Sequence, residues 1–190
     1  MQLISSLVAL CVASAALAAP GETSYSPPGN GGGNNGGNGP RCAPASQSVN
    51  FLRAYNSAVH DHFYTTNAGE MANAVQNLGY SAEGATGRIF PSNVRGATPL
   101  YRAYQPGVHD HFYTANEAEW NNAVANLGYS REGISGYIYP TQVCGSIPLY
   151  RAYHPGVNDH FYTTNEAEWN NAVQNLGYSR EGITGYVLPL

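Results

Sequence analysis

Short stretches of alternating apolar and polar residues, separated by turn residues, fill the chain from about residue 50 onward. Residues 100–104 and 111–114 are rich in tyrosine and other strand-forming residues, and each has the length of a short strand. Residues 105–107 between them read Gln-Pro-Gly, which is turn chemistry. We therefore predict a β-hairpin.

The hairpin is followed by a stretch with the period of a helix. Its apolar residues recur at i, i+3, i+4 and i+7: Trp120, Ala123, Val124 and Leu127. Asn116 and Glu119 have the spacing of an N-cap and a capping-box acid, and Gly128 lies where a left-handed residue commonly ends a helix. Glu132-Gly133 then predicts a turn, and residues 134–139 predict a third strand.

This β-β-α-β unit occurs three times with a period of 49 residues, over residues 50–96, 97–145 and 146–190. The second and third copies are nearly identical, whereas the first diverges. Met71, for example, stands where the other copies have Trp120 and Trp169.

One unit cannot bury both its helix face and its sheet. We therefore predict a β-rich α+β fold in which three β-β-α-β repeats close around a pseudo-threefold axis, as a single domain over residues 47–190. The alternative is a β-trefoil-like barrel with short helices. The helical stretch argues against a pure trefoil, which would use four strands per repeat.

The first 46 residues differ in composition from the repeats. Residues 1–18 predict a secretory signal peptide: from Leu3 onward they are almost wholly apolar or small, and they end in the cleavage pattern Ala16-Leu17-Ala18. Residues 19–46 are rich in Gly, Asn and Pro and predict a disordered linker. We expect a secreted, extracellular protein, with anchoring in a cell wall as an alternative role for the linker.

Two of the three cysteines remain once the signal peptide is removed. An oxidising compartment favours a disulfide between Cys42 and Cys144. The alternative is a pair of separate buried thiols.

Charge narrows the range of partners. Charged residues make up 11% of the chain, all eight basic residues are arginine, and the net charge is −4. Binding to nucleic acid or to an anionic membrane surface needs clustered basic residues. We therefore expect neither partner.

The repeated motifs Tyr-Arg-x-Tyr, Asp-His-Phe-Tyr-Thr-Thr, Asn-x-x-Glu, Gly-Tyr and Glu-Gly resemble those of an uncharacterised tandem-repeat family of secreted fungal and bacterial proteins. The resemblance covers residues 50–190. It implies an extracellular accessory module, sometimes found beside cell-wall hydrolases, and it implies no established activity.

The Asp-His-Phe-Tyr motif supplies the candidate ligand surface. Tyrosine faces beside Asp and His suit sugar rings, which need apolar area and polar tips. The candidate residues are Asp61, His62, Tyr64, Asp110, His111, Tyr113, Asp159, His160 and Tyr162. The alternative is that these residues fix the hairpin and its packing, and six further tyrosines recur in register with them: Tyr55, Tyr104, Tyr153, Tyr80, Tyr129 and Tyr178.

A metal site is not expected. His60-Asp61-His62 could present two imidazoles on one strand face, but Asn158 replaces the first histidine in the third copy. We predict no metal and no cofactor.

Arginine and glutamate recur in register in a chain that has few charges. We predict structural ion pairs, with pocket-lining groups as the alternative. The residues are Arg53, Glu83, Arg102, Glu132, Arg151 and Glu181.

The leading functional hypothesis is a secreted, non-enzymatic, lectin-like module that binds cell-wall or extracellular polysaccharide through several weak sites. Symmetric carboxylates offer no distinct acid and base, so we expect no catalytic residues. The alternatives are a secreted fungal effector or virulence-type protein that binds a host protein, and a small secreted hydrolase or inhibitor.

Overall fold

The computed structural model describes residues 42–190, and these form three similar units that each contain a three-stranded sheet and one helix. A short 3-10 helix, η1 (Ala45–Gln47), precedes them. Repeat one contains β1 (Val49–Asn56), β2 (Asp61–Thr65), α1 (Ala68–Asn77) and β3 (Ser81–Ile89). Repeat two contains β4 (Thr98–Gln105), β5 (Asp110–Thr114), α2 (Glu117–Asn126) and β6 (Ser130–Ile138). Repeat three contains β7 (Ile147–His154), β8 (Asp159–Thr163), α3 (Glu166–Asn175) and β9 (Ser179–Val187).

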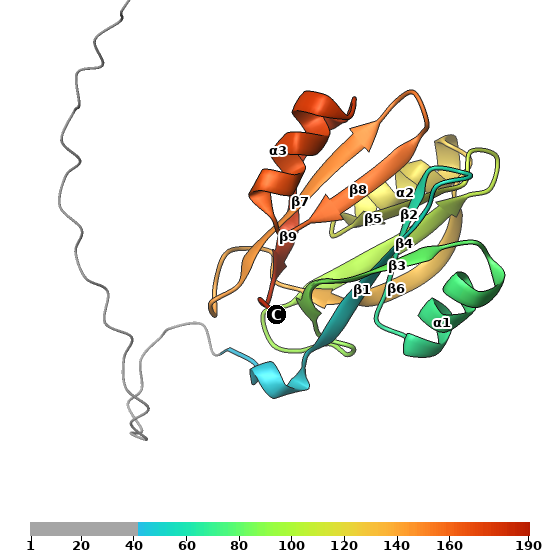
Figure 1. Ribbon diagram of the computed structural model, residues 1–190. Helices are drawn as coiled ribbons and strands as arrows, with labels where there is room; N and C mark the ends of the chain where they lie inside the picture. The colour runs from blue at the N-terminus through green and yellow to red at the C-terminus, as the bar shows by residue number, and fades with distance from the viewer. Residues whose placement is uncertain (1–41) are drawn as a thin grey trace, which may run out of the picture. The chain divides into compact units, whose positions relative to one another are not determined.

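The first strand of each repeat lies in the middle of its antiparallel sheet, giving the orders β2-β1-β3, β5-β4-β6 and β8-β7-β9. Successive side chains of a strand point to opposite faces. Phe51 and Tyr64 therefore join a core shared by all three repeats, while Ala54 and Phe63 pack under α1. The helices lie at the periphery and the sheets lie between them (Figure 1).

The shared core takes three equivalent residues from each repeat and closes the units around a pseudo-threefold axis, as predicted. Its members are Phe51, Tyr64, Ile89, Leu100, Tyr113, Ile138, Leu149, Tyr162 and Val187. The ends of the third strands also pair with one another, through the bridges Arg88–Leu188, Phe90–Tyr137 and Tyr139–Tyr186. Within residues 42–190 the three sheets stay separate, so the barrel alternative is wrong.

Three tyrosines on the axis form a closed ring of hydrogen bonds. The Tyr64 hydroxyl donates to the Tyr162 carbonyl (2.8 Å), Tyr113 donates to Tyr64 (2.7 Å) and Tyr162 donates to Tyr113 (2.7 Å). Each hydroxyl also accepts from a backbone N–H of the ring, such as Tyr64 N to the Tyr113 hydroxyl (2.8 Å). Burial raises the pKa of all three phenols well above the usual value. The ring ties every repeat to both of its neighbours.

The helix start confirms the N-cap but not the capping box. The Asn116 side chain accepts from the N–H groups of Ala118 and Glu119. The Asn116 N–H donates to Thr114 Oγ1 (3.0 Å), which leaves the Glu119 carboxylate available for other partners. Leu127, predicted to complete the apolar face, is 56% exposed because the helix ends one residue before it.

The turn predicted at Glu132-Gly133 is wrong. Both residues lie inside β6, where the pairing with β4 shifts register next to Arg102. Gly133 has a φ of 100°, so the feature is a bulge. A glycine with positive φ serves bulges and turns alike, which explains the misassignment.

The predicted disulfide is confirmed. Cys42 and Cys144 are bonded, with their Cα atoms 5.4 Å apart. Ala43 packs against a cluster of Phe90, Tyr139 and Leu188. Residues 42–46 therefore belong to the domain, although they were predicted as the end of the linker.

The predicted signal peptide (residues 1–18) and residues 19–41 of the predicted linker lie outside the described residues. Among residues 42–190, no helix is both long enough and apolar enough to cross a membrane.

Candidate ligand-binding site

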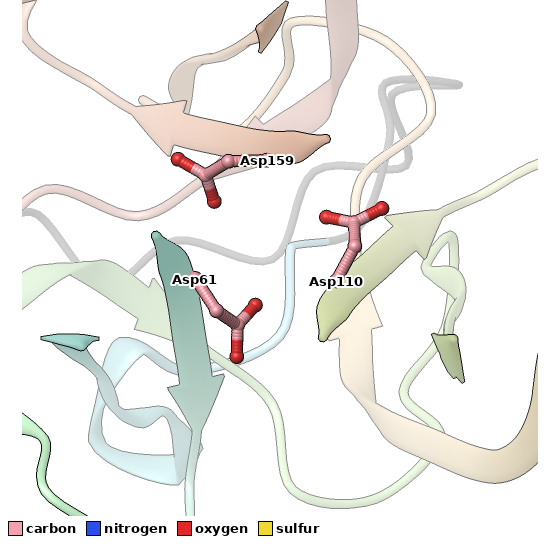
Figure 2. A group of neighbouring side chains, drawn as sticks. All are labelled: Asp61, Asp110 and Asp159. Atoms are coloured by element: carbon pink, nitrogen blue, oxygen red, sulfur yellow. The ribbon is translucent and has the colours of Figure 1, made fainter. Parts of the chain in front are cut away.

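Three aspartates lie at the starts of β2, β5 and β8 and surround the axis (Figure 2). Asp61, Asp110 and Asp159 are each 0% exposed, and one oxygen from each lies within 4.8 Å of those from the other two. Three carboxylate oxygens at this spacing are close enough to share a cation. Each carboxylate also accepts hydrogen bonds from a tyrosine hydroxyl and a backbone N–H, and we assign no metal to the cluster.

Each aspartate binds the histidine of the following repeat. His111 Nδ1 lies 2.6 Å from Asp61 Oδ2, and the His111 N–H donates to Asp61 Oδ1 (2.9 Å). The Tyr80 hydroxyl donates to the same carboxylate. The equivalent pairs are Asp110 with His160 and Asp159 with His62. Burial alone would raise the pKa of Asp159, but the hydrogen bond from His62 and its charge bring that pKa below the usual value.

The predicted ligand surface needs correction. Its aspartates are buried in these pairs, and its tyrosines Tyr64, Tyr113 and Tyr162 are 0% exposed in the central ring. Only the three histidines reach the surface, each with a side chain 11% exposed. The motif therefore builds the contacts between repeats, because its alternating side chains point toward the axis and toward the neighbouring repeat.

The first histidine of the His-Asp-His pattern is a turn residue. His60 has a φ of 57° and its equivalent Asn158 has a φ of 58°. Tyr55 OH lies 3.1 Å from His60 Nδ1, and Tyr153 OH donates to Asn158 Oδ1 (2.9 Å). Both residue types tolerate the left-handed region and can accept this bond. This explains how asparagine replaces histidine in the third copy.

The predicted ion pairs are present in all three repeats. Arg53 Nε lies 2.8 Å from Glu83 Oε2. The pairs Arg102–Glu132 and Arg151–Glu181 are each 2.9 Å.

Each arginine also binds a second glutamate, from the helix of the preceding repeat. Arg53 donates to both oxygens of Glu168 (3.0 and 2.9 Å), and Thr163 donates to the same carboxylate. The equivalent contacts are Arg102 with Glu70 and Arg151 with Glu119. The sequence carried a signal for these glutamates, the repeated Asn-x-x-Glu, but the capping box explained it locally.

The resulting Glu-Arg-Glu bridge, formed by Glu83, Arg53 and Glu168 at the first repeat, exposes its carboxylates more than its guanidinium. The Arg53 side chain is 14% exposed, against 32% for Glu83 and 37% for Glu168. Arg53 also lies over the Phe161 ring, 5.4 Å from its centroid. Burial alone would raise the pKa of Glu168, but its bonds from Arg53 and Thr163 lower it, so Glu168 is a stable anion.

A groove of about 470 Å³ lies beside this bridge, between repeats three and one; we call it the 3/1 groove. Repeat one contributes Tyr55 and His62 to its wall, and repeat three contributes Phe161, Tyr178 and the exposed Leu176. A smaller 1/2 groove, of about 190 Å³, shares most of these wall positions but lacks Tyr104, the counterpart of Tyr55. It is lined by Phe63, Leu78, Tyr80, His111 and the bridge of Arg102, Glu70 and Glu132.

The bridge has a second, more polar side. A cavity of about 150 Å³ also contacts Glu70, Arg102 and Glu132, and its other lining residues include Thr66 and Asn67. The equivalent region beside Arg151 holds about 540 Å³. The aromatic and polar spaces therefore meet at the bridge.

Three of the tyrosines outside the predicted ligand surface line the two grooves: Tyr55, Tyr80 and Tyr178. Tyr55 lies two residues after Arg53 on β1 and so on the same strand face. The Tyr178 hydroxyl donates to Asp159 (2.5 Å) while its ring lines the groove. The sequence shows that these tyrosines recur in register. It does not show which tyrosines the neighbouring repeat buries and which it leaves at the surface.

Comparison with known protein families identifies the family of this chain. The family model described as a domain of unknown function (DUF5648) matches residues 50–188, which spans all three repeats. No curated protein and no solved structure matches the chain.

Proposed function

The chain belongs to the DUF5648 family, and we propose that it is a secreted, non-enzymatic module that binds polysaccharide of a cell wall or extracellular matrix in the grooves between its repeats. We also infer that this family is the tandem-repeat family of secreted fungal and bacterial proteins which the motifs resemble. The disulfide between Cys42 and Cys144 fits an extracellular location.

One observation carries the proposal: the 3/1 groove combines aromatic side chains with carboxylates. The half-buried Tyr55 and Tyr178 and the more deeply buried Phe161 line it, and Glu83 and Glu168 supply hydrogen-bond acceptors. Sugars present apolar C–H faces and a rim of hydroxyls, so this combination suits them. Equivalent bridges recur at the other junctions, and a polymer that engages several weak sites gains avidity.

The ionisation of the bridge glutamates favours a binding role over a catalytic one. A glycosidase needs one carboxyl group with a raised pKa to act as the acid. Both glutamates of each bridge pair with the same arginine, and the pKa of Glu70, Glu119 and Glu168 lies below the usual value despite burial. The helix glutamates of the bridges are therefore carboxylates that accept hydrogen bonds and do not supply the acid that a glycosidase needs.

The proposal is tested by binding of the purified full-length protein to a glycan array and to insoluble cell-wall polysaccharides. We expect retention on at least one polysaccharide. Tyr55→Ala should weaken this retention, because Tyr55 lines the 3/1 groove and is only half-buried. Tyr101→Ala serves as the matched control, since Tyr101 stacks on Trp120 outside the lining of both aromatic grooves. Absence of retention on every glycan would refute the proposal.

A second candidate function is binding of a host protein, as expected of an effector. The observation in its favour is an exposed leucine at the end of every helix, at 55–56% exposure: Leu78, Leu127 and Leu176. Exposed apolar side chains at groove rims also suit protein ligands. Recovery of a defined protein by the immobilised chain, without glycan retention, would favour this function.

A further inference from the structure

The charge balance of the grooves bears on the kind of sugar they accept. Each Glu-Arg-Glu bridge contains two carboxylates and one guanidinium, so these groups contribute a formal charge of −1 at every junction. The whole chain is also negative, at −4. An anionic sugar would therefore meet repulsion in the grooves.

The guanidinium is occupied mainly by the two glutamates of the bridge. Arg53 uses Nε for Glu83 and both terminal nitrogens for Glu168, and its plane lies over Phe161. Its side chain is also the least exposed part of the bridge. The negative ends of the bridge consequently face the ligand.

The other titratable groups of the 3/1 groove are histidines and tyrosines, which carry no permanent positive charge. His62 Nδ1 lies 2.6 Å from the Asp159 carboxylate, which balances any charge on this imidazole, and His62 Nε2 lies 3.9 Å from Glu83 Oε2. His60 Nδ1 lies 3.1 Å from Tyr55 OH. His154 Nδ1 accepts a hydrogen bond from the Gly156 N–H (3.0 Å). The Tyr55 and Tyr178 rings provide faces that attract cations.

We infer that the grooves select a cationic amino sugar, and that the physiological ligand is a polymer of glucosamine units with free amino groups. This inference rests on the proposed function. An ammonium group can approach the two carboxylates of a bridge while the sugar ring packs on the aromatic wall. Repetition of the bridge along three junctions matches a polymer that carries a positive charge on every unit.

The ligand-side test compares a glucosamine hexamer with its fully N-acetylated counterpart in calorimetric titrations of the full-length protein. We expect at least about tenfold tighter binding of the free amine, and a loss of most of that preference between about 50 mM and 500 mM salt, as electrostatic attraction between exposed groups requires. Equal or tighter binding of the acetylated hexamer would overturn the inference and leave the proposed function standing. If neither hexamer bound and no other glycan did, both would fail.

The protein-side test changes charge at one exposed rim position. Leu176→Lys should weaken binding of the glucosamine hexamer by about five- to tenfold, and Leu176→Glu should preserve or strengthen it. Leu176 is 55% exposed, so both variants should fold, and thermal melting checks this. Equal effects of the two variants would show that charge is not recognised. Poly-lysine is the competing cation: if it binds and glucosamine oligomers do not, the inference is wrong and the groove recognises basic protein.

Discussion

At the scale of single residues, the arginine of each bridge is held by more contacts than a surface ion pair. Arg102 binds Glu70 and Glu132 and lies 5.5 Å from the centroid of Phe63. Burial alone would lower the pKa of Arg102, but its carboxylate partners raise it above the usual range. Arg102 on β4 therefore connects β6 of its own repeat with α1 of repeat one.

Arg102→Ala should destabilise the protein by about 2 kcal/mol. The change leaves two carboxylates facing each other without their cation, and partial solvent exposure reduces the cost below that of a fully buried pair. Urea unfolding measures the effect. Arg131→Ala is the control, with an expected change within about 0.5 kcal/mol, because Arg131 lies on the surface over Trp120. Equal effects would contradict a structural role for the bridge.

Thr184→Val should raise stability by about 1 kcal/mol. Thr184 Oγ1 is buried and has no hydrogen-bond partner among the described residues. Valine therefore removes a hydroxyl whose desolvation is not offset by a hydrogen bond. Thr163→Val should lower stability by about 1–2 kcal/mol, because Thr163 Oγ1 donates to Glu168 and accepts from the Asn165 N–H. Thermal melting compares the two variants, and a loss of stability in Thr184→Val would show that the hydroxyl is satisfied.

At the scale of elements, the bulge in each third strand sets the position of the bridge glutamate. Gly133 follows Glu132 in β6 and pairs with Arg102 across the sheet. The bulge shifts the register beside this pair, so Glu132 reaches Arg102 from the same sheet. The bulge in β6 therefore determines where the Glu132 carboxylate lies relative to Arg102.

Gly133→Ala should cost about 1–2 kcal/mol. A Cβ at this position meets no atom within 4 Å, so the whole penalty comes from the φ of 100°. Gly107→Ala is the matched control: its φ is ordinary, and its Cβ would meet only the flexible end of Gln105. Chemical denaturation should therefore leave Gly107→Ala close to the parent protein. Equal stability of both variants would argue against a strained bulge.

At the scale of the whole molecule, the tyrosine ring and the Asp-His pairs make the repeats mutually dependent. Tyr113 satisfies the Tyr64 N–H and the Tyr64 carbonyl with one hydroxyl. An isolated repeat would leave the backbone N–H and carbonyl of its ring tyrosine without partners. It would also lose the glutamate that the preceding repeat supplies to its arginine. We therefore expect the three repeats to unfold in one cooperative transition, unlike an open solenoid.

Tyr113→Phe should destabilise the whole domain by about 2–4 kcal/mol while keeping a single transition. The lost hydroxyl leaves a buried N–H and a buried carbonyl without partners. Tyr150→Phe, in the surface stack with Trp169, should change stability little. Calorimetry distinguishes the outcomes, and separate transitions for individual repeats would contradict this coupling.

Acid should weaken the contacts between repeats. The pKa values of Glu70, Glu119 and Glu168 lie below 4.5, the ordinary value of a glutamate, so their stabilisation is complete above about pH 5 and is lost as pH falls toward the folded-state values. The unfolding free energy should therefore decrease on acidification below about pH 5. Glu119→Gln should be less stable at neutral pH and should lose less on acidification. An identical pH profile for this variant would show that the glutamate does not contribute.

The sequence by itself determined the repeat and the order of strands and helix within it, and it correctly favoured the disulfide and the arginine–glutamate pairs inside each repeat. These depend on local periodicity, turn chemistry and recurrence in register. Only the tertiary structure decided which side chains are inaccessible: alternation assigns Tyr55 and Tyr64 to faces of their strands, but it does not say which part of a face the next repeat covers. Likewise Glu168 has a sufficient local explanation as a capping residue, and its bond to Arg53, 115 residues away, exists because the first and last repeats meet when the ring closes.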